Sequence, residues 1–274
     1  MNEIYDPFSI NFLKKTFQEK NIFLSKNRGQ NFLIDRNIAN KIIENVPLNM
    51  SIFEVGCGAG ALSKLVLERN QKLYGVEIDR KVYQLLKENL NDQNFILFHE
   101  DFLKFDLNLI EEKELFFLSN LPYSISGEAI RKFIEEDKLK SGVLMLQKEF
   151  VDRMLAKPDT KNYGLTSIIS HFYLEINKLF PVSKNCFFPV PEVDSLVISI
   201  NKKRCDFSQT SFSEFIKKAF SQRRKTIFNN LKQLNFSESE LEKLSINPFS
   251  RPESLDFEKW AILFEYYQSH KIQE

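Results

Sequence analysis

An apolar run that ends in an amide and a proline is the part of the sequence best suited to chemistry. The run FFLSNLPYSIS covers residues 116–126 and contains Asn120, Leu121, Pro122 and Tyr123. Asn120 offers a side-chain oxygen and Leu121 a main-chain oxygen, while Pro122 lacks an N–H and stiffens the turn. The ring of Tyr123 can stack on a flat base. From these residues alone two interpretations stay open: a pocket for a planar ligand, or an ordinary turn with a capping Asn and a packed Tyr.

The exocyclic amine of adenine is a substrate that such a pocket would suit. Its lone pair is delocalised into the ring, so the amine is a weak nucleophile. Hydrogen bonds from its two N–H groups to the oxygens of Asn120 and Leu121 would draw the nitrogen toward tetrahedral geometry and localise the lone pair. No strong base is required before attack, because positioning and charge alignment carry the rate.

A glycine-rich turn supplies a candidate cofactor site. The segment FEVGCGAGA covers residues 53–61, at the point where a strand-like run changes into a helix-like run. Gly56, Gly58 and Gly60 allow the backbone to approach a ligand closely, with helix N–H groups nearby. The pattern fits the dinucleotide motif G-x-G-x-x-G/A as well as an S-adenosylmethionine loop, and a glycine turn without a ligand is a third interpretation.

Acidic residues near the ends of strand-like runs bear on this choice. Glu77 suits either cofactor, because an acid at the end of the next strand accepts hydrogen bonds from a ribose diol. Glu54 has no role in pyrophosphate binding and favours a cationic ligand, which points to S-adenosylmethionine. Asp101 could accept a hydrogen bond from an adenine amino group, or it could be a helix N-cap or a surface acid.

The elements that must position these residues alternate between strand and helix. Strand-like runs are found at residues 51–55, 72–77, 95–98, 115–120, 142–147, 173–180 and 193–200. Helix-like runs follow several of them, near residues 60–70, 80–90 and 126–136 and from residue 148. This rhythm predicts a mostly parallel sheet covered by helices on both faces, with ligands at the carboxyl ends of the strands.

The pattern becomes helical after about residue 203. Helices are predicted over residues 211–221, 223–234, 238–244 and 254–270. The sequence therefore predicts two domains: a catalytic α/β domain over residues 1–203 and a small all-helical domain over residues 204–274.

Charge is unevenly distributed, although the 274-residue chain has a net charge of only +1. Residues 77–137 carry a net charge of −7, whereas residues 14–41 carry +5 and residues 202–232 carry +7. Two basic segments around an acidic middle favour a polyanionic partner and a cationic small molecule, although solvated helix faces would give the same pattern.

Cysteine usage and the N-terminal sequence bear on the compartment. Cys57, Cys186 and Cys205 form no C-x-x-C pair and are odd in number, which favours a reduced, cytosolic protein without structural zinc. The first residues lack the pattern of a signal peptide, and no apolar stretch approaches the length of a membrane span. We therefore expect a cytoplasmic protein that binds neither a metal nor a membrane.

With these motifs in order, the chain resembles the rRNA adenine N6-dimethyltransferases over almost its whole length. The matching segments are GQNFLID (29–35), EVGCGAG (54–60), GVEID (75–79), HEDFL (99–103), NLPYSIS (120–126), QKEFVDRMLAKPDTKNYGLTSI (147–168), FFPVPEVDS (187–195) and SQRRKT (221–226). Cys57 stands where Pro is common, and Ser124 where Asn is common. The resemblance implies a Rossmann-like, class I S-adenosylmethionine-dependent methyltransferase sheet with a small all-helical C-terminal domain.

The resemblance also implies roles for individual residues. Those matching the S-adenosylmethionine site are Asn31, Leu33, Gly56, Gly58, Glu77, Asp101 and Asn120. Asn120, Leu121 and Tyr123 match the pocket for the target adenine. Phe187 matches an aromatic residue that faces the flipped base from the other side, unless it is a plain core residue.

For the function, we expect dimethylation of the N6 amines of two adjacent adenines in a hairpin loop near the 3′ end of 16S rRNA, late in 30S assembly, by a monomer. The basic N-terminal arm and Arg223, Arg224 and Lys225 are expected to grip phosphates of the rRNA within the immature 30S subunit. Three alternatives remain: a large-subunit rRNA methyltransferase of the antibiotic-resistance type, a mainly non-catalytic assembly factor, and a nicotinamide oxidoreductase.

Overall fold

Packing divides the chain into two compact units. The computed structural model describes residues 5–23 and 30–270. One unit comprises Met1–Phe150 and Ile176–Lys202, and the other comprises Val151–Glu175 and Lys203–Glu274. The packing thus adds Val151–Glu175 to the helical unit, whereas the expected division of catalysis and RNA binding at residue 203 stays a prediction about function.

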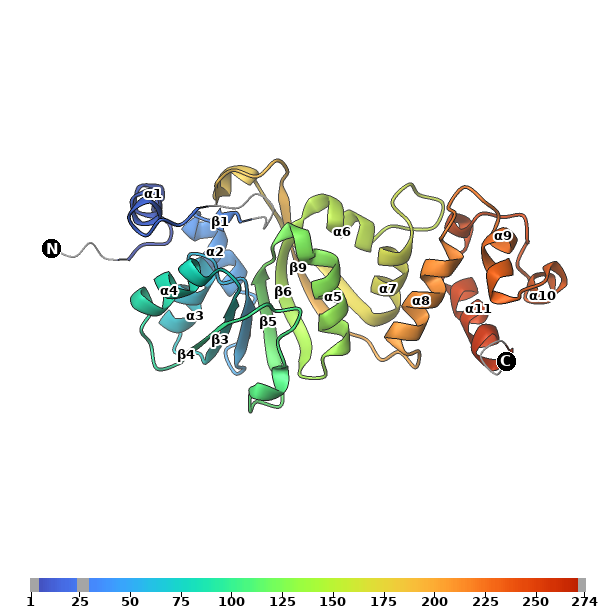
Figure 1. The fold of residues 1–274 in the computed structure, drawn as a ribbon, viewed down its shortest axis with the longest axis horizontal. Helices are drawn as coiled ribbons and strands as arrows, with labels where there is room; N and C mark the ends of the chain where they lie inside the picture. The colour runs from blue at the N-terminus through green and yellow to red at the C-terminus, as the bar shows by residue number, and fades with distance from the viewer. Residues whose placement is uncertain (1–4, 24–29, 271–274) are drawn as a thin grey trace. The chain divides into compact units, whose positions relative to one another are not determined.

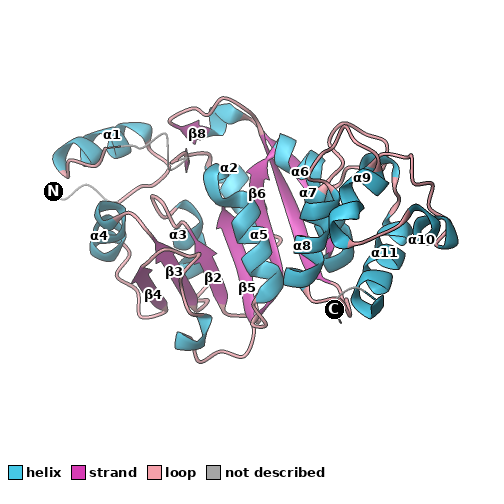
Figure 2. Ribbon diagram, turned by 45° about the vertical axis from the view of Figure 1, so that its right-hand side comes forward, coloured by secondary structure: helices cyan, strands magenta, loops and turns pink. Residues whose placement is uncertain are grey.

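A seven-stranded sheet forms the centre of the first unit (Figure 2). Across the sheet the strands are β4 (Phe95–His99), β3 (Leu73–Glu77), β2 (Ile52–Val55), β5 (Leu115–Asn120), β6 (Leu139–Gln147), β9 (Ser195–Lys202) and β7 (Leu174–Val182). The pairings β4–β3, β3–β2, β2–β5 and β5–β6 are parallel, whereas β6–β9 is antiparallel. The prediction of a mostly parallel sheet is confirmed.

Helices cover both faces of this sheet, as the alternation of side chains along each strand requires. The helices of this part are α2 (Arg36–Ile43), α3 (Ala61–Glu68), α4 (Arg80–Asn89) and α5 (Ser126–Glu135). On one face, Ile52 packs with residues of α2 and α3 in a single aliphatic core. On the other face, the rings of Phe53 and Phe117 lie 6.4 Å apart and those of Phe117 and Phe133 of α5 lie 5.5 Å apart. Figure 2 shows α5 lying over β5 and β6.

The N-terminal segment, expected only to be a basic arm, contains two capped helices and a strand (Figure 1). The Ser9 side chain accepts a hydrogen bond from the N–H of Phe12 at the start of α1 (Ile10–Glu19). The Asp35 side chain accepts from two N–H groups at the start of α2. Between the helices, β1 (Phe32–Leu33) pairs antiparallel with β8 (Phe187–Phe188). Lys26 and Arg28 of this expected arm lie outside the described residues.

The second unit is mostly helical in its described residues. Its helices are α7 (Leu165–Tyr173), α8 (Gln209–Ala219), α9 (Ile227–Leu231), α10 (Glu238–Lys243) and α11 (Phe257–His270), while α6 (Lys148–Met154) spans the change from one unit to the other. Its core is rich in aromatic residues: the rings of Phe212 and Phe264 lie 4.9 Å apart, and those of Phe220 and Trp260 lie 5.2 Å apart. Among the described helices, none is long and apolar enough to cross a membrane.

Candidate active site

A cavity of about 200 Å³ lies at the carboxyl ends of β2, β3, β4 and β5. This is the edge where a parallel α/β sheet places its ligands. All seven residues predicted to contact the cofactor line the cavity: Asn31, Leu33, Gly56, Gly58, Glu77, Asp101 and Asn120. The structure therefore brings together residues that are up to 89 positions apart in the sequence, and their contacts with a ligand stay predictions.

The glycine loop adopts a backbone that other residues rarely adopt. Gly58 has a φ of +56°, and a Cβ atom there would lie 3.0 Å from the ring of Phe32. Gly60, with a φ of +76°, immediately precedes α3, and a Cβ atom there would lie 2.8 Å from both Leu86 and Leu90. Left-handed backbone favours glycine. The tight turn brings the N-terminus of α3 to the wall of the cavity.

Glu77 holds this loop in place as well as lining the cavity. One carboxylate oxygen accepts a hydrogen bond from the Gly58 N–H at 3.0 Å, and the other accepts from the Asp79 N–H at 2.9 Å. Burial raises the pKa of Glu77, and the two backbone N–H groups oppose that shift. Each carboxylate oxygen has a second lone pair, so the group can still accept hydrogen bonds from a ribose diol.

Glu54 also borders the cavity, but its side chain is almost fully buried. It is 2% exposed, and its carboxyl oxygen accepts a hydrogen bond of 2.6 Å from the Ser63 hydroxyl. Burial raises the pKa of Glu54 to about 8, the Ser63 hydrogen bond lowers it in part, and the charge of Glu77 raises it further. The carboxyl group is therefore largely protonated at neutral pH, and a positive charge beside it would favour its ionised form.

Asp101 lines the cavity and stabilises a turn, while its contact with an adenine amino group stays a prediction. It lines the cavity just after β4, and its side-chain oxygen accepts a hydrogen bond of 3.0 Å from the Leu103 N–H. Its main-chain oxygen accepts from the N–H groups of Lys104 and Phe105, each at 2.9 Å. The acid thus stabilises the turn that carries it, as a capping residue does.

Asn120 is the last residue of β5, and its carboxamide has a defined orientation. The side-chain Nδ2 donates a hydrogen bond of 3.0 Å to the main-chain oxygen of Asn31. Because a carbonyl can only accept, this contact assigns the amide nitrogen to Asn31 and leaves Oδ1 as the acceptor. The next peptide is fixed too, since the Leu121 N–H donates to the Met145 oxygen at 3.1 Å. The Leu121 side chain is buried, so this residue can offer a substrate only its main chain.

Tyr123 lies beside the cavity rather than on its lining. Pro122 and Ser124 line the cavity, whereas Tyr123 is half-buried and its hydroxyl lies 2.9 Å from the Ser195 hydroxyl. Burial raises the pKa of Tyr123. Ser195 was not predicted as a site residue. It is the final residue of the matching segment FFPVPEVDS, so the sequence did offer a signal for it.

Phe187 and the predicted RNA-binding residues do not line this cavity. The Phe187 side chain is 1% exposed and belongs to the aliphatic core, and its backbone pairs with Leu33. In this structure the ring is a core residue, and its contact with a base stays a prediction. Arg223, Arg224 and Lys225 belong to the second unit.

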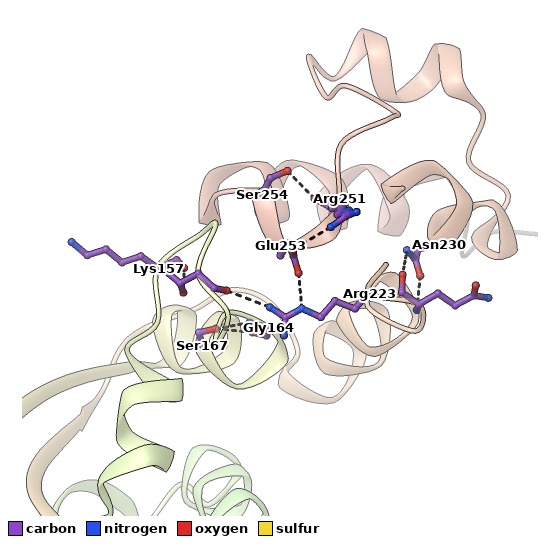
Figure 3. Close-up of polar contacts among 10 residues, drawn as sticks. Lys157, Gly164, Ser167, Arg223, Asn230, Arg251, Glu253 and Ser254 are labelled. Carbon is purple, nitrogen blue, oxygen red and sulfur yellow. Dashed lines mark hydrogen bonds and ion pairs between the residues drawn. The ribbon is translucent and has the colours of Figure 1, made fainter. Parts of the chain in front are cut away.

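Arg223 makes contacts within its own unit (Figure 3). Its Nε donates a hydrogen bond of 2.5 Å to Glu253, and a terminal nitrogen donates to the main-chain oxygen of Thr160 at 3.3 Å. Arg224 and Lys225 are exposed. No group of His, Cys, Asp and Glu residues that could hold a metal ion is found within the described part of the chain.

Comparison with known proteins matches this geometry to one family. The family model for ribosomal RNA adenine dimethylase matches residues 23–269. The chain belongs to the ribosomal RNA adenine dimethylase family. It is 41% identical to a Malacoplasma penetrans protein named "Ribosomal RNA small subunit methyltransferase A", over 94% of this chain and 96% of the relative. A Clostridium botulinum protein of the same name is 36% identical, over 87% of this chain and 92% of the relative.

Two solved methyltransferase structures share the fold. A dimethyladenosine transferase from Plasmodium falciparum aligns with a TM-score of 0.71 and 25% identity, covering 85% of this chain and 96% of that one. The 23S rRNA methyltransferase ErmE aligns with a TM-score of 0.63 and 20% identity, covering 87% of this chain and all of that one, which shows the fold alone. The predicted class I methyltransferase fold is confirmed.

Family membership confirms the predicted cofactor, S-adenosylmethionine. It excludes the alternative that the protein is a nicotinamide oxidoreductase. The protein is an S-adenosylmethionine-dependent rRNA adenine dimethyltransferase. The residues present fit this cofactor: a glycine turn gives close backbone approach, Glu77 offers acceptors for a ribose diol, and Glu54 lies where a cation would promote its ionisation.

Proposed function

We propose that the protein dimethylates the N6 amines of two adjacent adenines in a hairpin loop near the 3′ end of 16S rRNA, in the cytoplasm, as a monomer acting late in 30S assembly. The observation that carries the chemistry is the hydrogen bond from Asn120 Nδ2 to the Asn31 oxygen. The target rests on relatives named for the small subunit, at 36–41% identity over most of the chain.

Asn120 and Leu121 would activate the amine by accepting its two N–H groups. The Asn120 Oδ1 takes one N–H, because its Nδ2 is already bonded to Asn31, and the Leu121 main-chain oxygen takes the other. Both acceptors stand on a strand end fixed by the sheet, so little reorganisation is needed at the moment of reaction. Tyr123 would stack on the purine, a contact worth about 1–3 kcal/mol.

The transfer needs no general base before attack. Bound S-adenosylmethionine supplies a methyl group on a positively charged sulfur. The amine nitrogen forms its bond to the methyl carbon as the carbon–sulfur bond breaks, and one amine proton is then lost to solvent. After the first transfer one N–H remains, so the second transfer uses one of the two acceptors and requires room for a methyl group beside the other.

The proposal is tested with small and large ribosomal subunits isolated from cells without the gene. Radioactive methyl transfer followed by mass spectrometry should show dimethyladenine in small-subunit rRNA only. Label confined to large-subunit rRNA would reject the proposed target. Asn120→Ala should abolish transfer. Asn45→Ala should retain it, although it also removes a hydrogen bond from a side-chain amide to a main-chain oxygen, in this case an exposed one. An Asn120→Ala protein that binds subunits and restores assembly in full would indicate an assembly factor instead.

A further inference from the structure

An exposed aromatic ring stands among the basic residues of the second unit. The chain has 27 phenylalanines, and within the described residues 5–23 and 30–270 only Phe23 and Phe249 are exposed, at 80% and 67%. A phenylalanine ring gains nothing from water, since full burial of such a side chain is worth about 1.5–3 kcal/mol. Phe249 is therefore a candidate contact residue for a binding partner.

Hydrogen bonds fix the backbone of the loop that carries Phe249. The Phe249 N–H donates to the Asn247 side chain at 3.0 Å, and Pro248 before it is buried. The same loop is bonded to the start of α9: the N–H groups of Ile227 and Phe228 donate to the oxygens of Ser250 and Pro248, at 2.7 and 3.2 Å. Phe249 thus lies on a rigid loop next to the segment that carries Arg224 and Lys225.

Every charged residue in these two neighbouring segments is basic. They are Arg223, Arg224 and Lys225 in residues 221–226, and Arg251 in residues 247–251. The nearest acid along the chain from Arg251 is Glu253, whose carboxylate is bound by Arg223 at 2.5 Å and lies 4.0 Å from Arg251. Because Arg223 is engaged in this contact and Arg251 lies at its edge, the outward charge comes from Arg224 and Lys225 in full and from Arg251 in part.

An exposed aromatic ring on a loop that adjoins a basic segment matches a nucleic acid with an unpaired base. Cations bind the phosphates, and the ring takes the face of the base, whatever its identity. A protein partner would place an apolar contact at its centre, but the excess of Arg and Lys over the single neighbouring acid, Glu253, favours a polyanion. Exposed Arg and Lys side chains alone would give electrostatic binding, without any use for the phenyl ring.

We propose that Phe249, with Arg224, Lys225 and Arg251 on the two adjoining segments, forms an RNA-contact surface in which the ring stacks on an unpaired base of the rRNA. This inference rests on the proposed function, since the RNA is that of the small subunit. In this arrangement Arg223 is a positioning residue, which ties the segment of Glu253 to that of Thr160 rather than binding phosphate.

Equilibrium binding to small subunits that lack dimethyladenine provides the test. Phe249→Ala should weaken binding by about 5- to 150-fold, the factor expected for losing one stacked base, with an unchanged salt dependence. Phe249→Tyr should restore binding, because a phenol ring also stacks. Leu109→Ala removes another apolar side chain of 67% exposure, in the first unit, and should bind as the wild type does. Arg224→Ala and Lys225→Ala should each lower the slope of log affinity against log salt by about 1, whereas Arg223→Ala should leave it unchanged.

Short-wave ultraviolet crosslinking identifies the partner. In complexes of the wild-type protein, mass spectrometry should find a nucleotide attached to the peptide that contains Phe249. Binding by Phe249→Ala equal to that of the wild type, or a crosslink to a ribosomal protein at this peptide, overturns the inference. If the wild type neither binds nor methylates small subunits, the proposed function fails; if it does both while Phe249→Ala binds equally well, only the present inference fails.

Discussion

Replacing Glu54 with Gln should make the first unit more stable, by an amount that grows with pH. The Glu54 carboxyl is 2% exposed and burial raises its pKa to about 8, from an ordinary value of 4.5. The unfolded chain therefore loses this proton near pH 4.5, whereas the folded protein keeps it until about pH 8. Because the folded state then binds more protons, stability falls as pH rises through this window.

The size of the effect follows from the two pKa values. The raised pKa of Glu54 lowers the free energy of unfolding by about 1 kcal/mol at pH 5 and by about 3 kcal/mol at pH 7, from about 1.4 kcal/mol for each pKa unit. A glutamine has nearly the same shape and can accept the Ser63 hydrogen bond without a titrating group. Between pH 5 and pH 7 the advantage of Glu54→Gln over the wild type should therefore increase by about 2 kcal/mol.

Hydrogen exchange of the β2 amides during urea unfolding provides the measurement, because the single tryptophan, Trp260, lies in the second unit and would report only on that unit. Glu111→Gln, which removes an exposed carboxyl group, serves as the control for the loss of a charge. An advantage of Glu54→Gln that is the same at pH 5 and pH 7 would refute the reasoning, since it would mean that the buried carboxyl does not titrate in this window.

Three further predictions concern the site and the second unit. Asn120→Asp keeps the acceptor oxygens but loses the donor to Asn31, so kcat should fall by about 100-fold or more while S-adenosylmethionine still binds, as kinetics and calorimetry would show. Gly58→Ala, at a φ of +56°, should destabilise the first unit by about 1–2 kcal/mol and weaken cofactor binding, which calorimetry measures. Arg223→Ala should destabilise the second unit by about 1 kcal/mol, because it breaks a half-exposed pair with Glu253, and tryptophan fluorescence during unfolding would detect this loss.

Much of the site could be predicted because several of its residues lie at or just after the ends of strands. The run 115–120 was expected as a strand and is β5, so Asn120 stands at its carboxyl end. Continuous apolar residues are typical of a parallel strand buried on both faces, and the glycine spacing marks the turn after β2. These local signals were sufficient to place Gly56, Gly58, Glu77, Asp101 and Asn120 at one edge of the sheet, whereas Asn31 and Leu33 were expected there only from the family resemblance.

Other features depend on contacts between distant segments, which spacing does not reveal. The buried state of Glu54 depends on its neighbours in space, including Ser63 on α3. Phe187 is a core residue here because β8 pairs with β1, and a two-residue strand leaves no periodic pattern. The sequence gives no reason to distinguish Arg223 from its neighbour Arg224. In the fold, however, Arg223 binds Glu253, which lies 30 positions away along the chain.

The orientation of one amide decides how the site can act on its substrate. Had the Asn120 carboxamide been free to rotate, its NH₂ could face the adenine amine and donor would meet donor. The hydrogen bond to the main-chain oxygen of Asn31 makes that rotamer costly, because it would leave a carbonyl without its donor. Asn31 comes from the segment before β1 and Asn120 from the end of β5, so the acceptor geometry depends on the N-terminal segment being docked. The proposed role of Asn120 as an acceptor therefore depends on this one hydrogen bond between the N-terminal segment and β5.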